Sequence, residues 1–203
     1  MKLYYSPGAC SLAPHIVLNE IGQPYDLEKV DLAAKTTESG SDFTAVNSKG
    51  YVPTLELAKD QVLTEVSTIL QYLADKAEGS GLLPKFGSME RYRAMEQLNF
   101  IASELHKGIG GLFNKAMPDD GKKAIIERVQ KRLQWLDGQL AGKPYLLGDS
   151  YSVADAYAFT VLGWCKWVNV DLSKYGHITA YLDRVGARPA VQAAMKKEGL
   201  LAG

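Results

Sequence analysis

The order of strand and helix signals limits the fold of this chain more than any other feature. Through residue 77 the two kinds of signal alternate, beginning with the apolar-aromatic run Leu3–Tyr5. From residue 88 onward the apolar residues recur at helical spacing. Residues 79–87 lie between, rich in Gly, Ser and Pro as linkers are. The sequence therefore predicts an α/β domain over residues 1–78, a linker over 79–87 and an all-helical domain over 88–203.

Charge and cysteine content exclude several classes of protein. Lys plus Arg and Asp plus Glu both number 23, so no net charge attracts nucleic acid or an acidic membrane surface. No apolar run reaches the length of a membrane span. Two cysteines in 203 residues do not make a disulfide framework. We therefore expect a cytoplasmic protein without nucleic-acid or membrane partners.

Cys10 is the first candidate functional residue. Pro7-Gly8 ends the opening strand and helical spacing begins at Leu12, which places Cys10 at or just before a helix N-terminus. Unpaired backbone N–H groups and the positive end of the helix dipole favour a thiolate there, and thiols so placed have pKa values of roughly 3.5–7.5. The alternative is a small core residue, and we adopt that interpretation for Cys165.

A second candidate is Val52-Pro53. Proline cannot donate to a sheet, so Pro53 should begin a strand or lie at an edge, and Val52 before it should be extended. The backbone of Val52 could then pair with a peptide-like ligand that adds as a short strand. The alternative is a strand that simply begins with proline. A hairpin turn is expected at residues 58–60, followed by a returning strand.

Two charged residues have both a structural and a functional interpretation. Thr64 is expected to cap a helix that runs to Ala77, with Glu65 in the first turn, where negative charge is favoured. Alternatively, Glu65 holds a ligand amine while helix N–H groups hold a ligand carboxylate. Lys35 lies in a polar stretch over residues 31–47, predicted as a loop with one helical turn, where a lone lysine is usually a solvated charge.

The helical region contains two further patterns. One helix is predicted from Ser88 to Lys115, with an apolar stripe and a neighbouring polar stripe that includes His106. That histidine either faces solvent or lines a cleft. Ser152-Val153-Ala154-Asp155 is a capping-box pattern, which explains Asp155 without a catalytic role. A second long helix is expected from about Asp119 to Leu140.

Taken together, these motifs resemble those of the cytosolic glutathione transferases, and within them the bacterial beta class. The resemblance spans essentially the whole chain. It is carried by Tyr5–Ser11, by Gly50–Pro53, by Thr64-Glu65, and by the segment from Asn99 to Lys107. It implies a thioredoxin-like first domain with a mixed four-stranded sheet, an all-helical second domain, and a homodimer. Pro53 would be the cis-proline of that fold.

The resemblance also implies a glutathione site. Cys10 would lie against the glutathione sulfur, Val52 would pair with the cysteinyl part, and Lys35 would reach the glycyl carboxylate. Glu65 and the backbone of Val66 would hold the γ-glutamyl end. From the helical domain the expected residues are Asn99, Ser103, Glu104, His106 and Lys107, with Glu104 reaching the neighbouring subunit's site. One departure concerns position 66, where the family usually has serine or glycine and this chain has valine.

The expected activity is transfer of the glutathione thiolate to a small hydrophobic electrophile or a disulfide. Backbone N–H groups near Cys10, the helix dipole and His106 would stabilise the thiolate, and Cys10 itself could form a mixed disulfide with glutathione. Candidate walls of the second-substrate pocket are Phe113, Tyr157 and Trp164. A non-catalytic carrier of the same fold is the alternative. No metal is expected, because His15, His106 and His177 show no ligand spacing with either cysteine.

Overall fold

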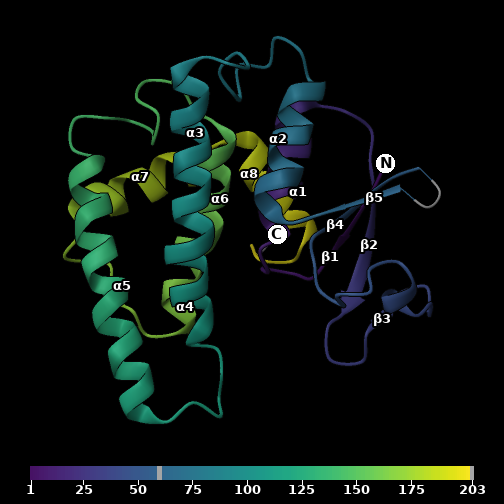
Figure 1. Cartoon of the computed structure of the whole chain (residues 1–203), viewed down its shortest axis with the longest axis horizontal. Coiled ribbons are helices and arrows are strands. Elements are labelled where there is room, and N and C mark those ends of the chain that lie inside the picture. Colours follow the sequence, from purple (N-terminus) through teal and green to yellow (C-terminus); the bar gives the residue numbers. More distant parts are fainter. Residues whose placement is uncertain (59–60, 202–203) are drawn as a thin grey trace. The chain divides into compact units, whose positions relative to one another are not determined.

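A computed structural model of the chain describes residues 1–58 and 61–201, and its strands and helices form two units (Figure 1). The first unit comprises Met1–Ser80 together with Arg188–Gly203, and the second comprises Gly81–Ala187. This grouping differs from the expected division at residues 188–203, because helix α8 (Pro189–Lys197) packs against helix α1 (Leu12–Ile21). Sequence periodicity identifies a helix but not the element on which it packs.

The first unit is built on one mixed sheet. Its strands are β1 (Lys2–Tyr5), β2 (Asp26–Asp31), β3 (Thr36–Thr37), β4 (Thr54–Ala58) and β5 (Gln61–Thr64). The order is β3-β2-β1-β4-β5, and among the described strand pairs only β1–β2 is parallel. The prediction of four strands missed β3, whose two residues are too few to show an alternating pattern. Lys59 and Asp60, in the expected hairpin turn, lie outside the described residues.

The strand predicted from the apolar-aromatic run is β1, which lies in the centre of the sheet and is buried at Leu3, Tyr4 and Tyr5. Helix α1 begins after Ser11 and is followed by Gly22, which has the left-handed φ of 64° typical of a helix C-terminus. Helix α2 (Val66–Lys76) packs on α1. The side chains buried between these elements include Leu3, Ile16, Leu55 and Leu70, all with no exposed surface.

The polar stretch after β2 is anchored by one aromatic side chain. Phe43 is fully buried and begins the short 3₁₀ helix Phe43–Ala45, which is the expected single helical turn. It packs with Tyr4, Val30 and Val52 in an apolar cluster. The cluster connects the loop to β1 and to the segment that precedes β4, so it fixes the position of Val52.

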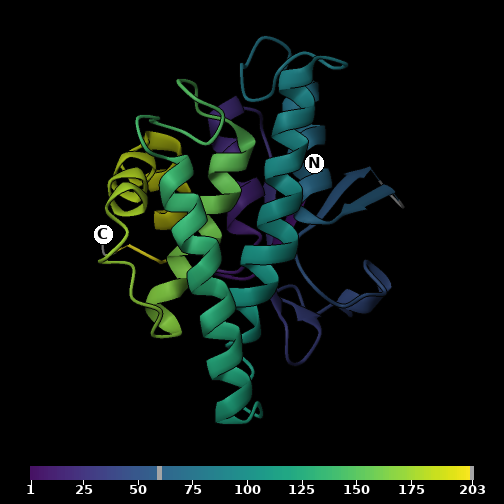
Figure 2. The ribbon, with the colours of Figure 1, turned by 60° about the vertical axis from the view of Figure 1, so that its left-hand side comes forward.

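The second unit is helical throughout its described elements, as predicted. They are α3 (Met89–Phe100), a π-helical segment (Ile101–His106), α4 (Lys107–Gly111), α5 (Asp119–Gln139), α6 (Val153–Leu162), a 3₁₀ helix (Gly163–Trp167) and α7 (Gly176–Gly186). Figure 2 shows α3 and α5 as the two long helices of this unit, with α6 packed beside α3.

The helix predicted over 88–115 is present but differs in two ways. It ends at Gly111, and the π-helical segment interrupts it at residues 101–106. A π-turn inserts extra backbone and rotates the residues that follow. Leu98, Leu105 and Ile109 of the expected apolar stripe are buried, whereas Met95 and Ala102 are only half-buried and their neighbours Ala94 and Ile101 lie inside.

The expected capping box is confirmed at the start of α6. The Asp155 carboxylate accepts hydrogen bonds from the Ser152 backbone N–H and hydroxyl, both at 2.8 Å. It also accepts from the Leu146 N–H at 2.9 Å and from the Tyr181 hydroxyl at 3.1 Å. Burial raises the pKa of this carboxyl above its ordinary value. Asp155 therefore has a structural role, and Cys165 is likewise a buried core residue.

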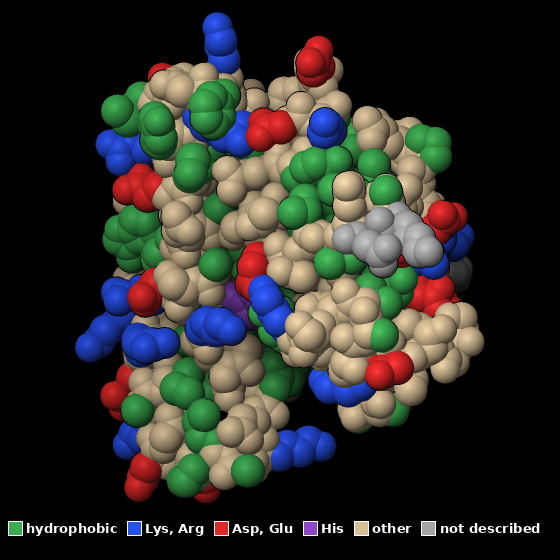
Figure 3. Space-filling view, turned by 45° about the vertical axis from the view of Figure 1, so that its right-hand side comes forward, with side chains coloured by type: hydrophobic (Ala, Val, Ile, Leu, Met, Phe, Trp, Pro, Cys, Tyr) green, Lys and Arg blue, Asp and Glu red, His purple; other side chains and the backbone are tan. Residues whose placement is uncertain are grey.

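The surface matches the balanced composition. On the face shown in Figure 3, Lys and Arg side chains are interspersed with Asp and Glu side chains. In the part of the chain that the structure describes, no helix combines the length and the apolar character that a membrane span needs.

Candidate functional site

Cys10 and Val52, predicted separately from two motifs, are in contact. The Cys10 thiol donates a hydrogen bond to the Val52 carbonyl oxygen, with Sγ and O 3.3 Å apart. Cys10 lies two residues before α1 and is half-buried. The peptide bond from Val52 to Pro53 is cis, as the fold resemblance predicts. The thiol therefore lies beside the extended segment that could pair with a peptide ligand.

The loop that carries Cys10 is fixed by a buried carboxylate from the other end of the chain. The Gly8 N–H donates to Glu198 Oε2 at 2.9 Å, and Glu198 Oε1 lies 2.8 Å from His15 Nδ1. The second ring nitrogen of His15 lies 3.0 Å from the Tyr25 hydroxyl. The His15 and Glu198 side chains have no exposed surface. No sequence signal relates Gly8 to Glu198, because 190 positions separate them.

Lys35 lies against the same extended segment. Its Nζ donates to the Gly50 carbonyl oxygen at 2.7 Å, and its side-chain carbons lie beside the Gly50 Cα, where a Cβ would meet them at 3.4 Å. The backbone of Lys35 has a positive φ of 58°. Lys35 is therefore not the solvated loop charge of its structural interpretation.

Glu65 also has a backbone conformation that L-residues rarely adopt. Among the described non-glycine residues, φ is positive only at Lys35, Glu65 and Asn169, and Glu65 has a φ of 69°. Asparagine tolerates this region, whereas lysine and glutamate are less often found there. Such conformations cost about 1–3 kcal/mol and cluster at functional sites. Two of the three positions are thus residues that the sequence analysis assigned to the site.

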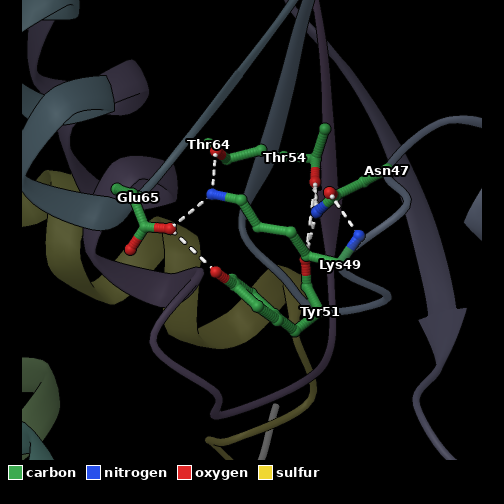
Figure 4. Close-up of polar contacts among 6 residues, drawn as sticks. All are labelled: Asn47, Lys49, Tyr51, Thr54, Thr64 and Glu65. Atoms are coloured by element: carbon green, nitrogen blue, oxygen red, sulfur yellow. Dashed lines mark hydrogen bonds and ion pairs between the residues drawn. The ribbon is translucent and has the colours of Figure 1, made fainter.

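The start of α2 differs from the expected arrangement. Thr64 was expected to cap the helix, but it ends β5, and Glu65 takes the capping position with no hydrogen bond from its side chain to the helix. The Glu65 carboxylate points toward Lys49 and Tyr51 (Figure 4). Glu65 thus lies at the start of the helix, as predicted, but as the residue before the first turn and not within it.

Two residues, Lys49 and Tyr51, donate hydrogen bonds to the Glu65 carboxylate. Lys49 Nζ donates to Glu65 Oε1 at 2.7 Å and to the Thr64 hydroxyl at 2.9 Å, and the Tyr51 hydroxyl donates to the same Oε1 at 2.8 Å (Figure 4). The hydrogen bond to the Glu65 carboxylate raises the pKa of the Lys49 ammonium and that of the Tyr51 phenol.

The sheet explains why sequence reasoning missed Lys49 and Tyr51. In the antiparallel β4–β5 pair Thr54 faces Thr64, so residues just before β4 lie beside the residue just after β5. The Asn47 amide fixes this segment by donating to the Tyr51 carbonyl at 2.9 Å and to the Thr54 hydroxyl at 3.0 Å. The pairing of Lys49 with Glu65 depends on strand register, and no motif reports it.

The remaining residues predicted for the first unit surround these contacts. Val66 is the first residue of α2, and its side chain is buried, with 5% exposed. It presents no polar side-chain atom to a ligand. Pro53 directly precedes β4 and follows Val52. The structure thus brings together Cys10 with Val52, and Glu65 with the segment that precedes β4.

In the second unit, His106 contacts two of the candidate pocket walls, Tyr157 and Trp164. His106 Nδ1 lies 2.6 Å from the Tyr157 hydroxyl. The His106 ring meets the Trp164 ring edge to face, with ring centroids 4.9 Å apart. Phe113 packs on Trp164 in turn, at 6.1 Å, and is half exposed. These residues form an aromatic cluster around one half-buried histidine, which is not the exposed histidine of its structural interpretation.

The other predicted residues of the second unit lie along the same helix. Asn99, Ser103 and Lys107 are exposed, and the Ser103 hydroxyl donates to the Asn99 carbonyl oxygen at 2.9 Å. Glu104 Oε2 accepts from Arg132 Nε at 2.6 Å, and this guanidinium lowers the pKa of the Glu104 carboxyl. Among the described residues, no group of three or more His, Cys, Asp or Glu side chains is arranged to hold a metal ion.

Comparison with known proteins gives a consistent result over both units. A family description, "Glutathione S-transferase, N-terminal domain", matches residues 8–76, and "Glutathione S-transferase, C-terminal domain" matches residues 100–189. The chain is 44% identical over 200 residues to glutathione S-transferase GstA of Escherichia coli O157:H7, covering 98% of this chain and 100% of that protein.

Two solved structures extend the similarity. A sphingomonad glutathione S-transferase complexed with glutathione is 47% identical, with a TM-score of 0.95, covering 99% of this chain and 100% of that one. A bacterial beta-class glutathione S-transferase from Sphingomonas chungbukensis is 46% identical, also with a TM-score of 0.95 and the same coverage.

Proposed function

The chain belongs to the glutathione S-transferase family, in its bacterial beta class, and from that premise we propose how its own residues bind glutathione and use the thiol. The protein is a glutathione transferase with glutathione as co-substrate. One observation supports the proposed site above the others. The Cys10 thiol contacts the carbonyl oxygen of Val52, the residue whose backbone is expected to pair with the tripeptide.

The first unit has a group suited to each part of glutathione. Val52, extended before the cis bond to Pro53, pairs with the cysteinyl backbone, as a strand-like ligand adds to a sheet edge. Lys35, fixed on the Gly50 carbonyl, binds the glycyl carboxylate. Glu65 binds the γ-glutamyl ammonium, and the backbone N–H of Val66 at the start of α2 binds the adjacent carboxylate. Cys10 lies at the ligand sulfur.

The second unit retains the role that the resemblance implies. Asn99, Ser103, Glu104, His106 and Lys107 contribute polar groups to glutathione binding, and Phe113, Tyr157 and Trp164 form the apolar surface for the second substrate. His106 acts as a hydrogen-bond donor, with its ring oriented by the Tyr157 hydroxyl. We further propose that the protein acts in the cytoplasm as a homodimer, with Glu104 of one subunit contributing to its partner's site.

Glutathione supplies the nucleophilic thiol for attack on an electrophilic carbon, and the protein's part is to favour the thiolate. Donors near the start of α1 and the helix dipole stabilise negative charge at the sulfur. With a disulfide substrate, Cys10 opens a second route. The Cys10 thiolate attacks a glutathione mixed disulfide, forms a new disulfide with the glutathionyl sulfur and releases the other thiolate. A second glutathione thiolate then regenerates Cys10 and leaves as oxidised glutathione.

The Cys10→Ala variant separates the two routes. We expect the variant to lose disulfide reductase activity and to keep conjugation of glutathione to a reactive aryl halide at a reduced rate. Cys165→Ala is the matched control, because it removes the other cysteine from a buried position and leaves Cys10 in place. Disulfide turnover by Cys10→Ala equal to that of the parent would contradict the covalent route.

The same experiment tests the family activity. Turnover of the aryl halide by both the parent and Cys10→Ala would show that other groups activate the glutathione thiol. If neither protein turns it over while both bind glutathione in equilibrium dialysis, disulfide chemistry or the carrier interpretation replaces the conjugating one. If the parent does not bind glutathione, the proposed site is wrong.

A further inference from the structure

Lys49 is a cation beside the proposed γ-glutamyl site that no role so far accounts for. Its side chain is 45% exposed, and that of Glu65 is 57% exposed, so this ion pair adds little to stability. The ammonium is nevertheless held by two acceptors, Glu65 Oε1 at 2.7 Å and the Thr64 hydroxyl at 2.9 Å. An exposed lysine fixed in this way is arranged for binding more than for folding.

We propose that Lys49 is a specificity-determining residue of the glutathione site, and that its ammonium binds the α-carboxylate of the γ-glutamyl residue. The inference rests on the proposed function and adds one residue to it. It concerns the part of the site where Val66 has no polar side-chain atom to offer.

The geometry follows from the chemistry of the ligand. The α-ammonium and α-carboxylate of a γ-glutamyl group are attached to the same carbon atom. A ligand ammonium on the Glu65 carboxylate therefore brings the ligand carboxylate close to Lys49, whose Nζ lies 2.7 Å from that carboxylate. A lysine ammonium has three N–H donors. Within the described part of the chain, Glu65 and Thr64 accept two of them, and the third can bind a ligand oxygen.

Charge complementarity supports the same assignment. Glutathione has two carboxylates, at opposite ends of an extended tripeptide. Lys35 donates to Gly50, at the segment before β4, and Lys49 donates to Glu65, at the start of α2. One lysine is thus available for each carboxylate. Tyr51 completes the arrangement, because its hydroxyl donates to Glu65 at 2.8 Å and holds that carboxylate in place beside Lys49 (Figure 4).

The opposite role for Lys49 makes a distinct prediction. If Lys49 only occupied the place of the ligand ammonium on Glu65, it would compete with glutathione, and its removal would tighten binding. If Lys49 only oriented Glu65, its removal would weaken every ligand that has the α-ammonium, whether or not the α-carboxylate is present.

Calorimetric binding of two peptides distinguishes these cases. The peptides are glutathione and γ-aminobutyryl-cysteinylglycine, which keeps the amine and lacks the α-carboxylate. We expect Lys49→Met to weaken glutathione binding about fivefold, the loss of one partly exposed ion pair, and to leave binding of the analogue unchanged. Lys49→Arg should retain glutathione binding. Lys76→Met is the matched control, an exposed lysine at the other end of α2, about 16 Å along the helix.

Three results would overturn the inference while leaving the proposed function intact. They are unchanged binding of glutathione by Lys49→Met, tighter binding, and an equal loss for both peptides. Failure of the parent protein to bind glutathione would overturn the proposed function and this inference together. Because Lys49 is exposed, circular dichroism of Lys49→Met should match that of the parent.

Discussion

Replacing Glu198 by alanine tests how the Cys10 loop is held in place. The substitution removes the acceptor of the Gly8 N–H and of the His15 ring, both buried. Each buried polar group left without its partner costs about 1–3 kcal/mol, and this substitution takes the partner from two of them. We therefore expect Glu198→Ala to lose about 4 kcal/mol of stability. For a chain of this size that lowers the melting temperature by about 10 °C.

The matched control is Glu20→Ala. Glu20 accepts from Arg188 at 2.7 and 3.0 Å, so it also connects α1 to the C-terminal segment, but it does not contact the Cys10 loop. Its side chain is 13% exposed and that of Arg188 is 28% exposed. We expect Glu20→Ala to lose about 1–2 kcal/mol of stability. Glu198→Gln keeps an acceptor oxygen, so its stability should lie between that of Glu198→Ala and that of the parent.

Two measurements on these variants separate stability from positioning. Urea unfolding followed by circular dichroism gives the stability, and amide hydrogen exchange of residues 6–10 reports on the loop. We expect exchange at Gly8 to be faster in Glu198→Ala and unchanged in Glu20→Ala, because only the first loses the Gly8 hydrogen bond. Equal destabilisation by the two variants, or unchanged exchange at Gly8 in Glu198→Ala, would refute the reasoning.

Two further predictions concern the buried polar groups. Asp155→Ala should lower the free energy of unfolding by about 3–4 kcal/mol, because Leu146, Ser152 and Tyr181 all donate to the carboxylate that is removed. Calorimetry measures this change, and a decrease of less than about 1 kcal/mol would contradict the prediction. At pH 8 an aromatic disulfide reagent should react fast with Cys10 and slowly with Cys165. Burial raises the pKa of the Cys165 thiol to about 12, which leaves only about one thiolate in ten thousand. In denaturant both thiols should react fast with the reagent. Fast reaction of both thiols in the folded protein would show that Cys165 is accessible.

Much of the fold follows from local patterns in the sequence. The Pro7-Gly8 break, the helix that ends just before Gly22 and the capping box at Ser152–Asp155 all depend on residues within a few positions of one another. The change from alternating strands and helices to helices alone likewise identifies the two architectures. Local propensity and capping chemistry determine such features, so one sequence is enough to predict them.

Features that depend on distant residues required the tertiary structure. The register of β4 against β5 brings Lys49 and Tyr51 to Glu65. Packing of α8 on α1 brings Glu198 to Gly8 across 190 positions. The sequence by itself determined which residues have the chemistry for a thiol site. Only the tertiary structure decided which groups fix them, because hydrogen bonds act over a few ångströms regardless of separation along the chain.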